Sequence, residues 1–267
     1  MSPRVSVVTS VFNGQRYLEE SIDSILGQSF GDFEFLILNN GSTDRTPQIL
    51  DRYDDPRLRV IHQPNIGIAA SLNKGIDLAQ APLIARVDAD DYSYSDRLQV
   101  QLAYMDQYPD VVLCGSRYSE WDENHSKSQS IPFVEGDREI RHKISCFNPF
   151  AHSQVIFRKS AFLTVGGYDQ KLHIAQDYDL WVRLLGTGEG HNLDYELGAI
   201  RVYENSFSRQ NEFNLFKEVV AIKWKAYRRL SGSLWLTGHG FFKTLTACLQ
   251  PARVLNVLFR SSTSLVK

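Results

Sequence analysis

The chain has 267 residues, of which 43% are hydrophobic and 22% are charged, as is typical of a soluble globular protein with one large domain. Its three cysteines lie far apart and form no zinc-like cluster with histidine, so we expect a reduced, cytoplasmic protein. The N-terminus lacks a signal-peptide pattern, and no window is apolar over the roughly eighteen residues that a transmembrane helix requires. We therefore expect neither a disulfide-stapled secreted domain nor an integral membrane protein.

The charge is unevenly distributed, although the formal net charge is only −2. Residues 1–204 carry 19 basic and 29 acidic residues, a net charge of −10. Residues 205–267 carry ten basic and two acidic residues, a net charge of +8. This asymmetry indicates an acidic catalytic or binding body with a basic tail that faces something anionic. The basic residues join no nucleic-acid-binding motif, so we expect no nucleic acid partner.

Apolar runs and helical periodicity alternate along the N-terminal part of the chain. The predicted strands are 4–13, 33–38, 57–63 and 82–87, and the predicted helices are 16–28, a segment from Thr46 onward, and one within 65–81. This alternation predicts a parallel, doubly wound α/β sheet, in which ligands bind beyond the carboxyl ends of the strands. Further helices are expected at 96–109 and 175–188, with a strand at 110–121 between them.

Three carboxylates, those of Asp88, Asp90 and Asp91, follow the fourth predicted strand. Like charges this close repel each other unless a cation lies among them or water solvates them fully. Asp88-Ala89-Asp90 resembles the DxD motif of nucleotide-sugar glycosyltransferases, in which carboxylates hold a divalent metal that bridges the donor diphosphate. Hard oxygen ligands suit Mg²⁺ or Mn²⁺, which would neutralise charge on the leaving diphosphate. Taken alone, the triplet favours a solvated turn.

Six segments in order extend this resemblance to the inverting family 2 glycosyltransferases of bacteria. They are SVVTSVFNG, LNNGSTDRTPQIL, NIGIAASLNKGI, ARVDADDYSYSDRL, NPFAHSQVIFRKS and AQDYDLWVRL, and together they span roughly residues 4–185. The resemblance implies a GT-A nucleotide-diphospho-sugar transferase fold over residues 1–204. The donor half would cover about 1–115 and the acceptor half about 116–204, with a basic amphipathic helical region over 205–267.

The resemblance also implies a reaction. It is a one-step in-line displacement that inverts the anomeric carbon and depends on Mn²⁺ or Mg²⁺. The donor would be a nucleotide-diphospho-sugar, with UDP as the first choice. The acceptor would be a hydroxyl of a glycan or a polyprenyl-linked molecule in surface polysaccharide synthesis. The sugar, the linkage and the oligomeric state stay open.

By position, the resemblance assigns Asp177 as the general base that takes the proton from the acceptor hydroxyl. A carboxylate at a helix start can do this if burial or the neighbouring Asp179 raises its pKa. The resemblance also assigns Asp90 as the metal ligand and places Asp88 near the ribose. Asp91 is expected to support these two carboxylates.

Other nucleotide contacts implied by the resemblance lie near the ends of the first three strands, at Ser10, Asn13, Asn40, Asn65 and Gly67. The family usually has Asp-Asp-Gly-Ser after the second strand, whereas this chain has Asn-Asn-Gly-Ser from residue 39. Asn40 can still accept a hydrogen bond from a uracil N–H through its carbonyl oxygen. Thymidine and guanosine donors nevertheless stay open.

Simpler interpretations exist for several of these residues. The Asn-Asn-Gly stretch suits a polar turn, and Asp177 and Asp179 would also be favourable as acids at a helix N-terminus. His152 is either a hydrogen-bonded core histidine or a contact to the acceptor or metal. For Arg86 we expect a solvated face. The Asn pair also leaves open a non-catalytic nucleotide-sugar-binding protein of the same fold, whereas a dehydrogenase would need a GxGxxG motif that is absent here.

The tail segment 215–230 predicts an amphipathic helix with basic residues opposite its apolar face. Such a helix is typical of membrane-surface binding, which would suit a polyprenyl-linked acceptor and a peripheral position on the inner face of the cell membrane. Alternatively, the apolar face packs on its own domain or on a second subunit.

Overall fold

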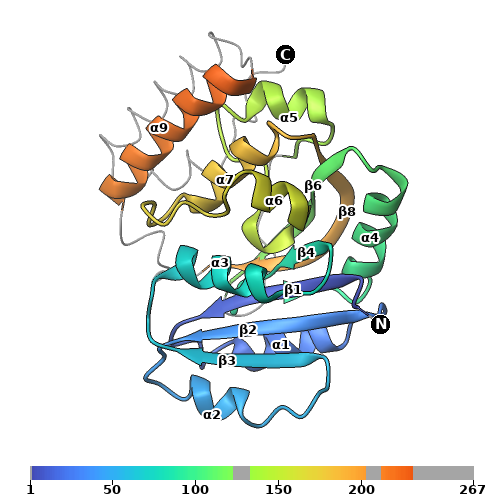
Figure 1. The fold of residues 1–267 in the computed structure, drawn as a ribbon, viewed down its shortest axis with the longest axis vertical. Helices are drawn as coiled ribbons and strands as arrows, with labels where there is room; N and C mark the ends of the chain where they lie inside the picture. Colours follow the sequence, from blue (N-terminus) through green and yellow to red (C-terminus); the bar gives the residue numbers. More distant parts are fainter. Residues whose placement is uncertain (1, 123–132, 203–211, 231–267) are drawn as a thin grey trace.

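The computed structural model describes residues 2–122, 133–202 and 212–230, and within them the apolar runs form one eight-stranded sheet (Figure 1). Its strands are β1 (Val5–Val11), β2 (Phe33–Asn40), β3 (Leu58–Gln63), β4 (Leu83–Arg86), β5 (Tyr92–Ser93), β6 (Val111–Trp121), β7 (Ile156–Arg158) and β8 (Glu189–Arg201). Their order across the sheet is β3-β2-β1-β4-β7-β6-β8-β5.

The first four strands pair in parallel, as the sequence predicts. Beyond β4 the sheet is mixed, because β7 runs antiparallel to both β4 and β6, while β8 pairs in parallel with β6 and antiparallel with β5. The doubly wound expectation is therefore confirmed for β1–β4, and the rest of the sheet is mixed. The strand β8 is not expected from the sequence, since its mostly polar residues lack a steady alternation.

Helices cover both faces of this sheet (Figure 1). They are α1 (Leu18–Leu26), α2 (Thr46–Leu50), α3 (Ile68–Leu78), α4 (Arg97–Gln107), α5 (Asp137–Lys143), α6 (Lys159–Thr164), α7 (Gln176–Leu184) and α9 (Glu212–Leu230), with a 3₁₀ turn η1 (His152–Gln154). Alternate residues of a strand face opposite sides, so one strand supplies two cores. Val7 packs with α1 and α4, whereas the adjacent Val8 packs with α3 and α7.

The strand β2 is longer than the apolar run that predicts it. Asn39 and Asn40 continue the strand instead of starting the turn, because they pair with His62 and Gln63 of β3. Both asparagines are almost completely buried, with 4% and 3% of their surface exposed. The turn begins only at Gly41, whose φ of 81° is in the left-handed region that glycine tolerates.

The helix α9 confirms the amphipathic pattern of the tail and shows what covers its apolar face. Leu215, Val219, Ile222, Ala226 and Leu230 are buried and belong to the same core as α7. For residues 215–230 the structure thus shows packing on the chain's own domain instead of a lipid-facing stripe. No helix in the described ranges is long and apolar enough to cross a membrane. The rest of the predicted basic region, 205–211 and 231–267, lies outside the described residues.

Candidate active site

The end of β4 carries a buried positive charge. Arg86, the last residue of the strand, is completely buried, so the expectation of a solvated face is wrong. Its guanidinium forms an ion pair with Asp88 and donates to the carbonyl of Val87. Arg97 is also completely buried and donates to the Arg86 carbonyl at 2.7 Å. These contacts hold the turn that follows β4 in one arrangement.

Asp88 is ionised at the centre of this turn. Its Oδ2 accepts a hydrogen bond from the Ser153 hydroxyl at 2.8 Å, and its N–H donates to the same hydroxyl oxygen at 2.9 Å. Burial alone would raise the pKa of Asp88, but the Arg86 charge, His152 and the Ser153 hydrogen bond lower this pKa to about 2. Asp88 therefore stays a carboxylate throughout the physiological range. Sequence reasoning missed Ser153, although it lies in the segment NPFAHSQVIFRKS.

Asp90 and Asp91 complete the acidic turn. Asp91 is 5% exposed, and its Oδ1 accepts the Arg201 N–H of β8 at 2.9 Å. Burial, followed by the charges of Asp90 and Asp88, raises the pKa of Asp91 well above its usual range. Asp90 is partly buried, and it is one of the groups that act on Asp91. A solvated turn does not describe this arrangement.

The donor groups of the turn can be tested against a divalent cation. Among the described residues no three or more His, Cys, Asp or Glu side chains cluster in a way that could hold an ion by themselves. Asp88 already binds Arg86 and Ser153, and Asp91 binds the Arg201 backbone. Mg²⁺ and similar ions are commonly held by one or two carboxylates plus substrate phosphates. The carboxylates of this turn match the ligand number of this second kind of site.

Asp177 approaches the site from the other side, in the first turn of α7. Its Oδ2 accepts a hydrogen bond from the Asn148 side chain at 2.9 Å. Burial is the largest cause that raises the pKa of Asp177 to about 6, and the Asp88 charge adds to it against hydrogen bonds from Tyr178 and Asn148. The charge of Asp88 is thus one of the influences on Asp177. A carboxylate with such a pKa suits proton transfer near neutral pH.

Asp179 has a different environment from Asp177, two residues away. It is 1% exposed, its Oδ2 accepts from Arg183 at 2.7 Å, and its Oδ1 forms an ion pair with Lys225 of α9. Burial, and not Asp179, is the largest cause of the raised pKa of Asp177. Asp179 instead fastens α7 to α9.

His152 lies between Tyr168 and Asp88. Its Nε2 lies 2.8 Å from the Tyr168 hydroxyl, and its Nδ1 lies 3.9 Å from Oδ2 of Asp88. Burial, together with the Arg86 charge, lowers the pKa of His152 to about 3, so the ring is neutral. The hydrogen-bonded histidine is the interpretation that these contacts match. Sequence reasoning also missed Tyr168. It lies 16 positions from His152 in the chain, and no local sequence pattern links the two residues.

The loops after β1 and β2 are joined by hydrogen bonds. Asn13, with a φ of 55°, accepts the Thr43 N–H at 2.8 Å through its side chain, and its own N–H donates to the Ser42 hydroxyl at 2.9 Å. Ser10 donates to the Ser71 hydroxyl of α3 at 2.8 Å. Ser10 and Asn13 thus lie at the predicted strand end, where the Ser10 side chain binds α3 and the Asn13 side chain binds the loop after β2.

Asn40 shapes the loop before α3. Its carbonyl oxygen accepts from Gln63 Nε2 at 3.1 Å and from the Ile66 N–H at 3.0 Å, and its amide donates to Asn65 at 3.4 Å. Asn65 accepts in turn from the N–H of Gly67, whose φ is 83°. Both lone pairs of the Asn40 oxygen therefore already accept hydrogen bonds from the chain itself. The resemblance instead leads us to expect that this oxygen accepts a hydrogen bond from a base N–H.

Two large apolar side chains are exposed at this edge, although sequence reasoning did not single them out. Phe12, directly after β1, is 53% exposed, and Ile66, shortly before α3, is 46% exposed. Exposed aromatic and aliphatic groups beside a polar edge offer a surface against which a planar ring can pack.

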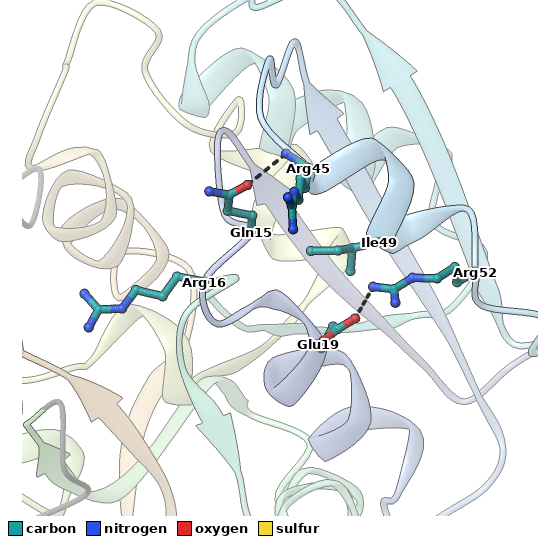
Figure 2. Close-up of a pocket in the computed structure, with 6 residues that line it drawn as sticks. All are labelled: Gln15, Arg16, Glu19, Arg45, Ile49 and Arg52. Carbon is teal, nitrogen blue, oxygen red and sulfur yellow. Dashed lines mark hydrogen bonds and ion pairs between the residues drawn. The ribbon is translucent and has the colours of Figure 1, made fainter.

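A basic hollow of about 530 Å³ lies beside the same loops, between α1 and α2 (Figure 2). It is lined by Gln15, Arg16, Glu19, Arg45, Ile49 and Arg52. Figure 2 shows the Gln15 side chain bonded to the Arg45 N–H, at 3.0 Å, and the ion pair of Arg52 with Glu19. No residue that the sequence assigns to the site lines this hollow.

Comparisons with known proteins agree with this architecture. A family model described as Glycosyl transferase family 2 matches residues 6–165, more than half of the chain. EpsE of Bacillus subtilis (strain 168) is 32% identical over 95% of this chain and 92% of its own length. The amylovoran biosynthesis glycosyltransferase AmsE of Erwinia amylovora is 28% identical over 95% of this chain and 97% of its own length.

Solved structures show the same fold. The structure of S. aureus TarS 1–349 in complex with UDP has a TM-score of 0.70 and 18% identity, over 97% of this chain and 76% of TarS 1–349. The mannosyltransferase PcManGT of Pyrobaculum calidifontis, in complex with GDP-Man and Mn²⁺, has a TM-score of 0.64 and 18% identity, over 96% of this chain and 79% of its own. With the family model and the EpsE similarity, these findings identify the chain as a glycosyltransferase of glycosyl transferase family 2.

Proposed function

We propose that the protein is an inverting glycosyltransferase. It moves a sugar from a nucleotide-diphospho-sugar to a hydroxyl of a glycan or polyprenyl-linked acceptor in surface polysaccharide synthesis. One observation carries the proposal: the fold places a carboxylate bound to a buried arginine, Asp88, at the end of β4 and a second carboxylate, Asp177, bound by Asn148 in the first turn of α7. Their environments move their pKa values in opposite directions, Asp88 to about 2 and Asp177 to about 6. Paired carboxylates of this kind divide into a permanent anion and a proton-transferring group. The name of AmsE supports polysaccharide synthesis as the setting.

The donor side of the reaction belongs to the turn after β4. Asp90 would hold Mn²⁺ or Mg²⁺, which when bound neutralises charge on the leaving diphosphate. Asp88 remains ionised and can accept from a ribose hydroxyl, because each carboxylate oxygen has a second lone pair. The UDP in the TarS complex and the GDP-Man with Mn²⁺ in the PcManGT complex support a nucleotide-sugar donor and a divalent ion. UDP is the first candidate.

The acceptor side belongs to α7. Asp177 takes the proton from the acceptor hydroxyl as the hydroxyl oxygen forms a bond to the anomeric carbon. The bond from that carbon to the diphosphate breaks on the opposite face, so the product is a glycoside of inverted configuration and the nucleoside diphosphate leaves. Asn148 holds one oxygen of Asp177 at 2.9 Å and fixes the direction of the other. A pKa of about 6 leaves the base mostly ionised at pH 7.

The basic C-terminal region is proposed to bring the enzyme to an anionic membrane surface on the cytoplasmic side. Residues 205–267 carry a net charge of +8. The outer face of α9 adds an exposed Trp224, at 56%, beside Arg228 and Arg229. Anionic lipids attract each such basic residue by about 1 kcal/mol, and Trp favours the membrane interface. A polyprenyl-linked acceptor would be presented at the same surface.

The donor assignment is tested by a thermal-shift panel of UDP, TDP, GDP and CDP, each with and without Mn²⁺. A ligand that binds only the native state raises the unfolding midpoint by mass action. We expect a Mn²⁺-dependent shift with one nucleotide in the wild type and its loss in Asp90→Asn. No shift with any nucleotide would contradict the donor site. A shift that Asp90→Asn retains would contradict the metal ligand alone.

The membrane assignment has a separate test. Wild type and a chain that lacks residues 231–267 are sedimented with vesicles of neutral lipid or of neutral lipid plus phosphatidylserine. We expect binding to the anionic vesicles to fall when the segment is removed. Equal binding of the two proteins would contradict the role of this segment.

A further inference from the structure

Glu218 of α9 binds the backbone that leads into α7. Its Oε1 accepts the His173 N–H at 2.8 Å, and its Oε2 accepts the N–H groups of Ile174 and Ala175 at 3.0 and 2.9 Å. The bonds connect residues that are 43 to 45 positions apart in the chain. Ala175 is the N-cap of α7, and this end has no side-chain cap of its own. A distant carboxylate therefore replaces a local cap.

A second charged contact lies along the same helix. Lys225 forms an ion pair with Asp179, which also binds Arg183 at 2.7 Å. Glu218 and Lys225 are seven residues apart, which is about two helical turns, so they lie on the same side of α9. The buried Ile222 lies between them in the chain. Figure 1 shows α9 beside α7, and the two charged contacts fasten the first part of α7 to it.

Asp177 lies between these two anchors. It follows Ala175, which Glu218 binds, by two residues and precedes Asp179, which Lys225 binds, by two residues. Its own carboxylate accepts a 2.9 Å hydrogen bond from the side chain of Asn148, which does not belong to α9. The place of the Asp177 backbone is thus set by α9, and the direction of its side chain by Asn148.

We propose that Glu218 is a positioning residue that holds Asp177 where it can reach the acceptor hydroxyl. This inference rests on the proposed role of Asp177 as the general base. Without the carboxylate, three backbone N–H groups ahead of α7 lose their acceptor, and the segment must rearrange to find water. Misplacement of a reacting group by about 1 Å can lower a rate by about a hundredfold. The C-terminal helix is therefore part of the catalytic arrangement.

The test is Glu218→Gln in the full chain. Glutamine has the size of glutamate but only one side-chain oxygen. Its NH₂ group is a donor and cannot accept a hydrogen bond from the backbone N–H that it faces. Hydrogen–deuterium exchange is measured on peptides that cover residues 172–178. Turnover is followed as release of nucleoside diphosphate from UDP-GlcNAc and, separately, from GDP-mannose, each with Mn²⁺. We expect at least tenfold faster exchange at residues 173–175 and about a ten- to hundredfold lower kcat, with the donor KM within about twofold.

Two matched variants separate positioning from general destabilisation. Val219→Ala shortens a buried side chain next to Glu218 without touching the bonds to residues 173–175, and Glu139→Gln removes a half-exposed carboxylate that pairs with Lys143 on α5. We expect Val219→Ala to lower Tm while it keeps wild-type kcat at 25 °C, and Glu139→Gln to change neither. If Val219→Ala lowers kcat as far as Glu218→Gln does, stability explains the loss and the proposal is overturned.

The outcomes distinguish this inference from the proposed function. An active wild type together with unchanged exchange and unchanged kcat in Glu218→Gln overturns the positioning role and leaves the glycosyltransferase assignment standing. A wild type that binds no nucleotide and releases none from either sugar donor overturns the proposed function, and with it the role of Asp177 on which this inference rests.

Discussion

The donor edge and the acceptor side of the site are held in place by different means. At the donor edge, the loops after β1, β2 and β3 bind one another largely through neutral side chains, as Asn13 binds Thr43 and Asn40 binds the Ile66 N–H, and a charged pair, Arg86 with Asp88, holds only the turn after β4. On the acceptor side, the first turn of α7 is held by charged groups from α9, Glu218 and Lys225. The donor edge is thus organised by segments that converge at the strand ends, and the acceptor side by a helix from the far end of the chain.

The largest expected effect is on the acceptor side. Asp177→Asn keeps the shape of the side chain but cannot take a proton, and general-base catalysis is worth about 10²- to 10⁴-fold in rate. Transfer should fall by that factor while the nucleotide-induced thermal shift is kept. As a control, Asp194→Asn alters an exposed carboxylate that pairs with Arg117, and it should leave turnover unchanged. Near-normal turnover in Asp177→Asn would contradict the assignment of Asp177 as the general base.

Arg86 lies at the end of β4, on the donor side, and its loss should mainly affect stability. Arg86→Met leaves Asp88 without its buried positive partner, and breaking such a pair typically costs about 3–5 kcal/mol. Urea unfolding followed by tryptophan fluorescence measures this cost. Arg4→Met breaks an exposed ion pair with Asp106 and should change stability by at most about 1 kcal/mol. Equal costs for the two variants would contradict the structural role of the buried charge.

At the donor edge, removal of one amide should have a smaller effect. Asn40→Ala takes the acceptor from Gln63 and from the Ile66 N–H, and an unsatisfied buried donor costs about 1–3 kcal/mol. The same change should weaken the nucleotide-induced thermal shift, because the loop 65–67 loses its support. Gln107→Ala, at an exposed helix end, should stay within about 0.5 kcal/mol of wild type. If Asn40→Ala kept the full nucleotide-induced thermal shift, the loop 65–67 would not need the Asn40 side chain for its conformation.

The smallest effect is a pH dependence in which activity and stability change in opposite directions. The base works when ionised, so kcat should fall about tenfold per pH unit below the pKa of Asp177, about 6. Because this pKa is raised in the folded state, protonation of Asp177 favours folding, and its contribution to stability grows as pH falls from 7 towards 4. The lowered pKa of Asp88 leaves that group ionised over this window. The free energy of unfolding of the wild type minus that of Asp177→Asn, measured at several pH values, isolates the contribution of Asp177. A difference that does not change with pH would contradict this prediction.

The sequence predicted more of the structure of the donor edge than of the acceptor side, and the reason is physical. Short local sequence patterns indicate strand ends and turn residues, and β1–β4 follow those patterns closely. The Arg86 backbone pairs with Val155, whose carbonyl accepts its N–H at 3.0 Å, and Asp177 is bound by Asn148, and no local sequence pattern relates these partners. The extension of β2 through Asn40 likewise requires its partner strand. Long-range contacts decide these features, and one sequence does not display them.

The place of β7 in the sheet governs the order in which the chain can be completed during synthesis. This three-residue strand lies between β4 and β6, both of which precede it by many positions in the chain. Until residues 156–158 leave the ribosome, β4 has an open edge, and an open edge is a template for pairing with another chain. A truncated chain that stops before β7 would therefore keep this aggregation-prone edge.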